Sequence, residues 1–330
     1  MEFMDGLPGY YTESAIPAAS RTLRNAIDCC GTGLHSGRAT RLVLKPAPAG
    51  TGIVFRRTDL GIDLPARFDL VTDTRLCTKL SAPGHPEATV GTIEHIMAAL
   101  SATAIDNVII EVDGPEIPIF DGSAAPFVFL IDCAGIADLG TTRDMIEILR
   151  PVSISDHGAT ATIEPLPAGH NWVGLDLSVS IDFEASAIGC QEFDLRLTEA
   201  GFRSEVASSR TFAMAREIKQ LQAAGLARGG SLANAVVVEG DRILNPEGLR
   251  VSREFVRHKV LDAVGDLALA GASLIGRFHG NRSGHRINNL LLRALFADPT
   301  AFRHVTAAGL LARSYGSGMQ MPVGMAAAAA

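Results

Sequence analysis

The sequence predicts an α+β protein made of two similar units, each a sheet followed by helices, packed face to face. The chain has 330 residues, which is enough for two domains of ordinary size. Both halves show short β-type segments followed by helix-type segments, and a polar stretch at 138–144 separates them. No residue-level repeat accompanies this shared order, so the similarity of the two units is a prediction about architecture.

The first half is expected to span residues 20–142 and to begin with alternating segments around a Pro- and Gly-rich turn. Strands are predicted at 39–44, 52–58, 75–80 and 107–112. A helix is predicted over 87–102 because its apolar residues share one face. A second helix is predicted to follow Ser123, which is a residue type that caps helix N-termini.

The second half is expected to span residues 143–320 and to repeat this order. Strands are predicted at 146–154, 159–165, 172–182, 191–196, 234–244 and 272–279. Helices are predicted at 198–206, 213–224, 252–270 and from about 285. Residues 1–19 are expected to be a poorly ordered extension and residues 321–330 a frayed tail.

Composition limits the classes of partner and compartment. A formal net charge of −7 gives no reason to expect nucleic acid or an anionic membrane surface as a partner. No stretch reaches the roughly 18 consecutive apolar residues of a membrane-spanning helix. The 5 cysteines form no CxxC pair and no even framework, and a chain of this size does not need disulfides, which favours a reducing compartment. We therefore expect a soluble cytoplasmic protein that acts as a monomer.

Three polar residues lie one turn apart on one face of the predicted helix at 252–270: His258, Asp262 and Asp266. A histidine and a carboxylate four residues apart can bind one cation, and such sets with an open position are typical of catalytic zinc. The alternative is an exposed helix pair without function. The HxxxD spacing alone favours that alternative, because it is common by chance.

A second signal is the adjacent pair Glu94 and His95 inside an otherwise apolar predicted helix. Burying an unpaired carboxylate is costly, so a partner or a metal ion is expected nearby. A glutamate beside a zinc ligand can act as a general base toward water. The segment matches neither HExxH nor HxxEH. The alternative is that Glu94 faces solvent and that His95 is an ordinary half-buried residue.

Two further segments carry weaker signals. A Ser-Gly pair places His285 at the start of a predicted helix, where a protonated imidazole could serve a leaving amine; the alternative is a capping or surface histidine. Thr211 and Phe212 offer a hydroxyl and an aromatic ring, but nothing local distinguishes their segment from an ordinary turn.

Together these segments resemble the UDP-3-O-acyl-N-acetylglucosamine deacetylase family, the zinc enzymes of lipid A biosynthesis in Gram-negative bacteria. The resemblance runs from about residue 21 to about residue 300. The matching strings are GLHSG (33–37), FRRTD (55–59), TIEH (92–95), IDNV (105–108), PEIPIFDGSAAPF (115–127), SRTF (209–212), GGS (229–231), NPEGLR (245–250), FVRHK (255–259), LDAVGD (261–266) and SGH (283–285).

The resemblance implies a sandwich of two sheet-plus-helix domains, with helices between the sheets and the active site at the domain interface. It implies that His95, His258 and Asp262 bind zinc; a set of this kind also suits iron(II). The implied reaction removes the acetyl group from UDP-3-O-(3-hydroxyacyl)-N-acetylglucosamine, which is the committed step of lipid A biosynthesis. The implied partner is therefore a UDP-linked acylated amino sugar.

The resemblance also assigns roles to the remaining site residues. Glu94 corresponds to the base that activates water, and His285 to the acid that protonates the departing amine, with Asp266 holding that histidine. Lys259 and Thr211 correspond to groups near the developing oxyanion and the substrate. Phe212 and Cys77 correspond to residues near the sugar or the acyl passage. Two alternatives stay open: a zinc amidohydrolase of this fold that acts on another N-acyl amino sugar, and a catalytically silent binding protein.

Overall fold

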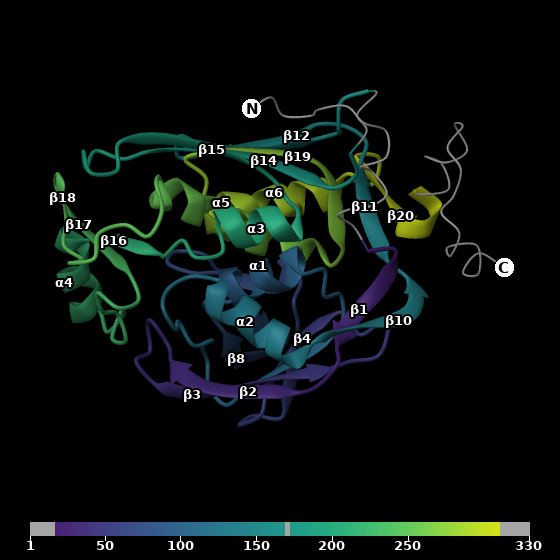
Figure 1. Cartoon of the computed structure of the whole chain (residues 1–330), viewed down its shortest axis with the longest axis horizontal. Coiled ribbons are helices and arrows are strands. Elements are labelled where there is room, and N and C mark those ends of the chain that lie inside the picture. The colour runs from purple at the N-terminus through teal and green to yellow at the C-terminus, as the bar shows by residue number, and fades with distance from the viewer. Residues whose placement is uncertain (1–16, 169–171, 311–330) are drawn as a thin grey trace.

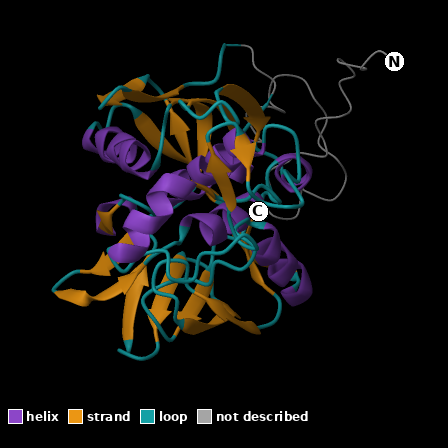
Figure 2. Ribbon diagram, turned by 90° about the vertical axis from the view of Figure 1, so that its left-hand side faces the viewer, coloured by secondary structure: helices purple, strands orange, loops and turns teal. Residues whose placement is uncertain are grey.

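The computed structural model describes residues 17–168 and 172–310. The predicted tail lies outside the described residues, and so does nearly all of the predicted N-terminal extension, whose last residue begins the first strand. Two sheets enclose a layer of helices, as Figure 1 shows from one side and Figure 2 from another. The predicted α+β sandwich with helices between the sheets is therefore confirmed.

The lower sheet of Figure 1 belongs to the first half of the chain, with strand order β2-β3-β9-β4-β5. Its strands, in that order, are Ile27–Thr32, Ala39–Pro46, Val108–Val112, Ile53–Arg57 and Ile62–Pro65. β9 pairs antiparallel with β3 and parallel with β4, and its residues alternate between buried and half-buried. That alternation is expected of a strand with one face on the core.

Shorter strands complete the first half. A small antiparallel sheet contains β6 (Val71–Asp73), β7 (Lys79–Ala82) and β8 (His85–Val90), and the 3₁₀ helix η2 (Phe68–Leu70) precedes it. β1 (Ala19–Leu23) pairs antiparallel with β10 (Ile136–Thr142), so the start of the first half is joined to its end.

The upper sheet belongs to the second half and has the order β12-β13-β19-β11-β20, with β14 on β19 and β15 on β14. Its strands are β11 (Asp144–Ile148), β12 (Val152–Asp156), β13 (Ala159–Glu164), β14 (Leu175–Asp182), β15 (Cys190–Arg196), β19 (Ser273–Asn281) and β20 (Phe302–Thr306). β19 is central because it pairs with β11, β13 and β14.

Helices fill the space between the sheets. They include α1 (Glu94–Ala102), α2 (Ala125–Ala134), α3 (Glu199–Glu205), α5 (Glu254–Leu267), which continues into the 3₁₀ helix η3 (Ala268–Ala270), and α6 (His285–Ala297). A separate layer beside them contains β16 (Phe212–Met214), α4 (Ala215–Ala223), β17 (Val236–Glu239) and β18 (Arg242–Ile243). In the described part of the chain, no helix combines the length and the apolar character that crossing a bilayer requires.

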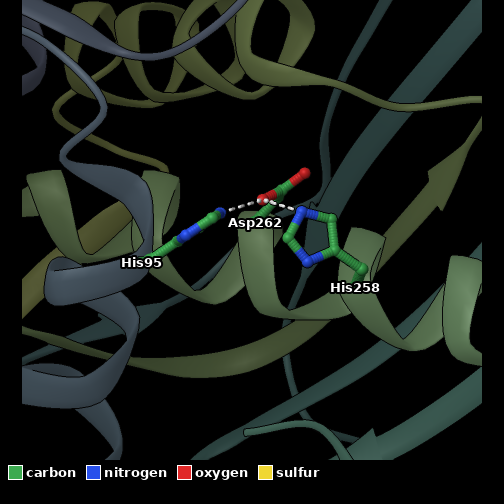
Figure 3. A group of neighbouring side chains, drawn as sticks. All are labelled: His95, His258 and Asp262. Atoms are coloured by element: carbon green, nitrogen blue, oxygen red, sulfur yellow. Dashed lines mark ion pairs between the residues drawn. The ribbon is translucent and has the colours of Figure 1, made fainter. Parts of the chain in front are cut away.

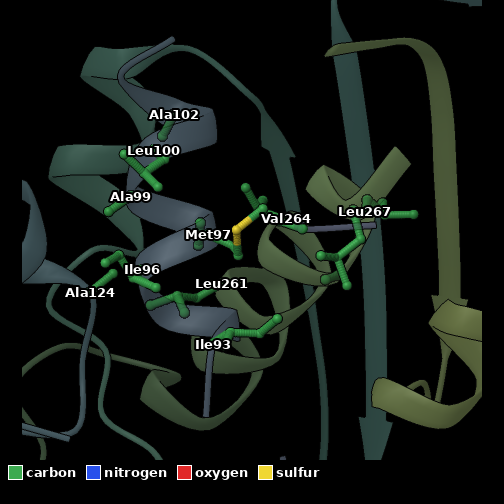
Figure 4. Close-up of a cluster of buried hydrophobic side chains, with 14 of the residues drawn as sticks. Ile93, Ile96, Met97, Ala99, Leu100, Ala102, Ala124, Leu261, Val264 and Leu267 are labelled. Atoms are coloured by element: carbon green, nitrogen blue, oxygen red, sulfur yellow. The ribbon is translucent and has the colours of Figure 1, made fainter. Parts of the chain in front are cut away.

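The core centres on the contact between α1 from the first half and α5 from the second (Figure 4). Ile96 and Met97 of α1 are fully buried, as is Leu261 of α5, and Val264 is 1% exposed. α1 is apolar on nearly all sides because neighbours cover every face of it. Burying each such side chain stabilises the fold by about 1.5–3 kcal/mol.

A glycine sets how closely these two helices approach. A Cβ added to Gly265 of α5 would lie 1.9 Å from the carbonyl oxygen of Glu94 in α1 and 2.7 Å from its carbonyl carbon. Both atoms belong to the backbone and cannot rotate away. Residue 265 must therefore lack a side chain for α1 and α5 to keep this spacing.

Some predicted element boundaries are wrong. The helix predicted over 87–102 begins only at Glu94, because His85–Val90 forms strand β8. A turn with Gly84 at φ 76° lets β8 fold back and pair with β7, and this pairing overrides the helical pattern of the segment. The strand predicted at 75–80 likewise begins only at Lys79, which pairs with Asp73 of β6.

Other details of the predicted elements also differ in the structure. The N-cap of α2 is Ala124 and not Ser123, whose hydroxyl instead hydrogen-bonds Asp121 at 2.8 Å and accepts weakly from the Ala125 amide at 3.3 Å. The polar stretch at 138–144, which was expected to separate the two halves, lies almost wholly in strands β10 and β11. The single strands predicted at 146–154 and 234–244 are each two strands, and the second break falls at Gly240 with φ 63°.

We predict that Gly265→Ala separates α1 from α5 and lowers the free energy of unfolding by about 1–3 kcal/mol, the usual range for overpacking. Urea denaturation measures this change. The control is Gly284→Ala, since an added Cβ there has no atom within 4 Å and the backbone φ is −161°. Equal stability of the two variants would contradict the proposed spacing constraint.

Candidate active site

Glu94 and His95 are the first two residues of helix α1, which lies in the layer of helices between the two sheets. The residue two positions earlier, Thr92, has φ 58°, a left-handed conformation that costs a residue with a side chain about 1–3 kcal/mol. Its hydroxyl donates to Glu116 at 3.0 Å, which holds the turn. Glu94 is only 4% exposed and His95 only 3%. The alternative in which Glu94 faces solvent is therefore wrong.

His258, Asp262 and Asp266 lie on one face of α5, as the spacing predicts. All three are buried, with 2%, 3% and 2% exposure. The alternative of an exposed helix pair is therefore wrong. Burial of three ionisable groups on one helix face is costly unless each has a partner.

The structure brings His95 of α1 together with His258 and Asp262 of α5 (Figure 3). Oδ1 of Asp262 lies 3.3 Å from Nε2 of His258 and 3.7 Å from Nε2 of His95. The two imidazole rings stand edge to face with centroids 5.0 Å apart. One ligand atom from each residue lies within 4.8 Å of the other two, which is a spacing suited to a single metal ion.

Hydrogen bonding fixes which nitrogen of His258 faces this point. Its Nδ1 lies 3.0 Å from the carbonyl oxygen of Ser209, which can only accept, so Nδ1 carries the proton. Nε2 then presents a lone pair toward Asp262. Sequence patterns do not single out this carbonyl, because any residue type supplies a backbone oxygen. A hydrogen bond of this kind is the usual support of a metal-binding histidine.

The charges of the three residues also suit a cation. Burial lowers the pKa of His258, and burial together with His258 lowers that of His95 to about 3, so both rings are neutral. Burial raises the pKa of Asp262, but His258 and Lys259 outweigh this and hold it below its usual range. Among the described residues, Oδ1 of Asp262 has no hydrogen-bond partner although it is buried. The set therefore fits a divalent metal ion with three protein ligands.

Glu94 lies beside this set with its carboxylate held in place. Oε2 accepts a hydrogen bond from the backbone amide of Thr78 at 3.0 Å, and Oε1 lies 3.9 Å from Nε2 of His285. Burial raises the pKa of Glu94 to about 7, although the nearby His285 opposes the shift. A carboxylate with this pKa can accept and release a proton near neutral pH.

His285 begins α6, as predicted, and its side chain points to the same region. Its Nδ1 lies 3.0 Å from Oδ2 of Asp266. Burial lowers the pKa of His285, but the charges of Asp266 and Glu94 outweigh it and raise the pKa to about 9. Since its side chain is only 11% exposed, the surface-histidine alternative is wrong. The imidazole is therefore protonated at neutral pH.

Two residues that sequence reasoning missed hold Asp266. Thr78 donates its hydroxyl to Oδ1 at 2.6 Å, and Asn288 donates its amide to Oδ2 at 2.9 Å. Asn288 follows His285 by three residues in α6, so its place on the same helix face was a usable signal. Thr78 gave no comparable signal, because it lies before β7 and no helical periodicity relates it to the site.

Lys259, Thr211 and Phe212 line one cavity of about 980 Å³ together with His258. Nζ of Lys259 lies 2.8 Å from Oδ2 of Asp262. Burial lowers the pKa of Lys259, but Asp262 outweighs this and raises it above its usual value. The cavity walls also include apolar residues of the β14–β15 and β16–β17 segments. A ligand in this cavity would meet both a cationic group and an apolar surface.

Cys77 is placed elsewhere. It lines a neighbouring cavity of about 430 Å³, and only Arg75 lines both this cavity and the larger one among their described residues. The thiol is 7% exposed, and burial with the charge of Glu94 raises its pKa to about 12. The structure therefore places Cys77 next to the site but not in the same cavity as Phe212.

Comparison with known proteins adds an independent finding. Residues 20–297 match the family model described as UDP-3-O-acyl N-acetylglycosamine deacetylase. The chain is 48% identical over 289 residues to the UDP-3-O-acyl-N-acetylglucosamine deacetylase of Anaeromyxobacter dehalogenans, with 88% of this chain and 91% of the relative covered. It is 49% identical over 288 residues to that of Phenylobacterium zucineum, with 86% and 95% covered. It is 44% identical over 288 residues to the deacetylase of that name from Aliivibrio fischeri, with 87% of this chain and 92% of the relative covered.

We predict that zinc raises the melting temperature of the metal-free protein, because a ligand of the folded state at 100 times its Kd stabilises it by about 2.7 kcal/mol. Asp262→Ala should abolish this shift by removing one of the three ligands. The control is His304→Ala, whose exposed histidine lies on β20. A zinc-dependent shift that survives in Asp262→Ala would show that zinc binds elsewhere. Thermal unfolding with and without zinc measures both variants.

Proposed function

We propose that this chain, which belongs to the UDP-3-O-acyl N-acetylglycosamine deacetylase family, deacetylates a UDP-linked, 3-O-acylated N-acetylglucosamine. Water cleaves the amide, acetate leaves, and the sugar keeps a free amine. The reaction is the committed step of lipid A biosynthesis. The observation that carries the proposal is the buried set of His95, His258 and Asp262. Beside this set lie Glu94, which can accept a proton, and His285, which carries one at neutral pH.

His95, His258 and Asp262 would hold a zinc ion. When bound, the ion would polarise the amide carbonyl and lower the pKa of water toward about 7. Glu94 takes the proton of the attacking water, and its pKa of about 7 leaves much of it ionised at neutral pH. The amide hydrogen bond from Thr78 orients this carboxylate.

His285 then donates its proton to the amide nitrogen as the bond to carbon breaks. Asp266 holds the ring through Nδ1, so that Nε2 is the atom that gives up the proton. Lys259 and Thr211 line the cavity together with His258, where they would stabilise the negative charge that develops on the carbonyl oxygen. Leaving-group protonation matters because an amine anion is a very poor leaving group.

The cavity of about 980 Å³ is the proposed substrate site, with Phe212 against the sugar or the start of the acyl chain. Cys77 is proposed to contact the substrate from the neighbouring cavity. The two halves of the chain, 20–142 and 143–320, act as two domains with the site between them. We propose that the protein works as a cytoplasmic monomer and that iron(II) can replace zinc.

The direct test is deacetylation of UDP-3-O-(3-hydroxyacyl)-N-acetylglucosamine by the purified protein. A chelator should abolish turnover, and zinc should restore it; iron(II) added without oxygen tests the second metal. Turnover of a different N-acyl amino sugar, with none of the UDP-linked acyl sugar, would point to the alternative substrate. Activity that survives complete metal removal would contradict the proposed chemistry.

We predict that kcat/KM falls as the pH rises through about 9, because His285 loses the proton that the leaving amine requires. His285→Ala should lower kcat by about 10²–10⁴-fold and remove this alkaline limb, while the metal content stays near that of the wild type. Rate measurements between pH 6 and pH 10 and elemental analysis test both parts. Loss of the metal from His285→Ala would show that the residue supports the metal site instead.

A further inference from the structure

A buried ion pair joins the loop that contacts His258 to the start of helix α5. Arg210 is 1% exposed and Glu254 is fully buried. The Arg210 guanidinium donates from Nε to Oε1 of Glu254 at 2.9 Å and from Nη2 to Oε2 at 3.2 Å, and the backbone amide of Arg210 also donates to Oε1 at 2.9 Å. The remaining guanidinium bonds reach Glu247 at 2.6 Å and the carbonyl of Gly248 at 2.7 Å.

Stability does not by itself account for such a pair. The cost of removing two charges from water often equals or exceeds their attraction, and apolar replacements of similar size are frequently neutral or stabilising. Among the described residues, the hydrogen-bond partners of this pair all lie within 210–254, and none comes from the first half of the chain. A pair with so many directed bonds fixes positions more strongly than an apolar contact would.

The positions of the two residues indicate what they fix. Glu254 opens α5 and lies one turn before His258, so it continues the polar face formed by His258, Asp262 and Asp266. Arg210 directly follows Ser209, whose carbonyl oxygen accepts from Nδ1 of His258 at 3.0 Å. The pair therefore joins the loop and the helix that carry the two ends of this hydrogen bond.

We propose that Arg210 and Glu254 are a positioning pair for the metal centre. They hold the Ser209 carbonyl against His258, and this contact fixes the tautomer and the ring angle of His258. Neither residue touches the metal or the substrate. The inference rests on the proposed function, because it assumes that His258 binds a metal ion through Nε2.

The same pair sets the place of Thr211. This residue follows Arg210, and its amide donates to the carbonyl of Gly122 at 2.8 Å, which anchors the other side of the loop. A shift of Arg210 would therefore move Ser209 and Thr211 together. Both the metal ligand and the hydroxyl in the cavity depend on one short segment.

Two variants test the proposal: Arg210→Lys, which keeps the charge but loses the two-pronged bond, and Glu254→Gln, which keeps the shape and one acceptor oxygen. The matched control is Arg143→Lys. Arg143 is also buried and lies between β10 and β11, and its guanidinium donates to Asp106 and Ser273, each at 2.8 Å, neither of which is a residue of the site. The three variants should lose similar stability, so melting temperature alone does not separate them.

The deciding readout is zinc affinity, measured by competition with a coloured chelator on folded protein. We expect zinc to bind Arg210→Lys about tenfold more weakly, the lower end of the effect of losing support behind a ligand. Glu254→Gln should change in the same direction, and Arg143→Lys should stay within about twofold of the wild type. The imidazole N–H resonance of His258 should shift in Arg210→Lys and Glu254→Gln but not in Arg143→Lys.

The outcomes separate this inference from the proposed function. If the wild type binds zinc and folded Arg210→Lys and Glu254→Gln bind it equally well, the positioning role is overturned while the proposed function stands. If Arg143→Lys loses as much affinity as they do, the effect is general destabilisation and the role is again overturned. If the wild type binds no zinc, both proposals fail. If Arg210→Lys does not fold, Glu254→Gln decides the question alone.

Discussion

The distance between α1 and α5 is the constraint on which the site depends. α1 carries His95 and α5 carries His258 and Asp262, so the three side chains meet only at one separation of the two helices. Gly265 permits that separation, since even one carbon atom there would overlap the backbone of Glu94. The surrounding apolar packing then holds the helices in contact, because separating them would break the close packing of buried side chains such as Ile96 and Leu261.

The same contact concentrates ionisable groups in a region that excludes water. Burial alone would favour the neutral form of each group. Neighbouring charges oppose this effect at some of them, as the directions of their pKa shifts show. Burial raises the pKa of Glu94, whereas Asp266 and Glu94 overcome burial at His285 and raise its pKa as well. The result is a base that is poised near neutrality and an acid that keeps its proton. Two titrating groups with such different environments are a recurring feature of acid–base catalysis.

Much of this arrangement was predictable from local patterns. The four-residue spacing of His258, Asp262 and Asp266 indicated one helix face, and a Ser-Gly pair before His285 indicated the start of a helix. Other expectations failed where tertiary pairing overrode local preference. Residues 87–90 were predicted to be helical, yet the turn at Gly84 lets them pair as part of strand β8. Ser123 has a residue type typical of an N-cap, but Asp121 takes its hydroxyl.

The sequence by itself determined the residue types, their order along each helix and the polar face of α5, because helical periodicity is a local property. Resemblance to a family then assigned roles to residues whose local signals were weak. The tertiary structure alone decided which backbone carbonyl supports His258, which residues hold Asp266, and how a buried Arg210 pairs with Glu254. Those contacts join segments distant along the chain, and no periodicity within one segment records which distant atom will lie beside it.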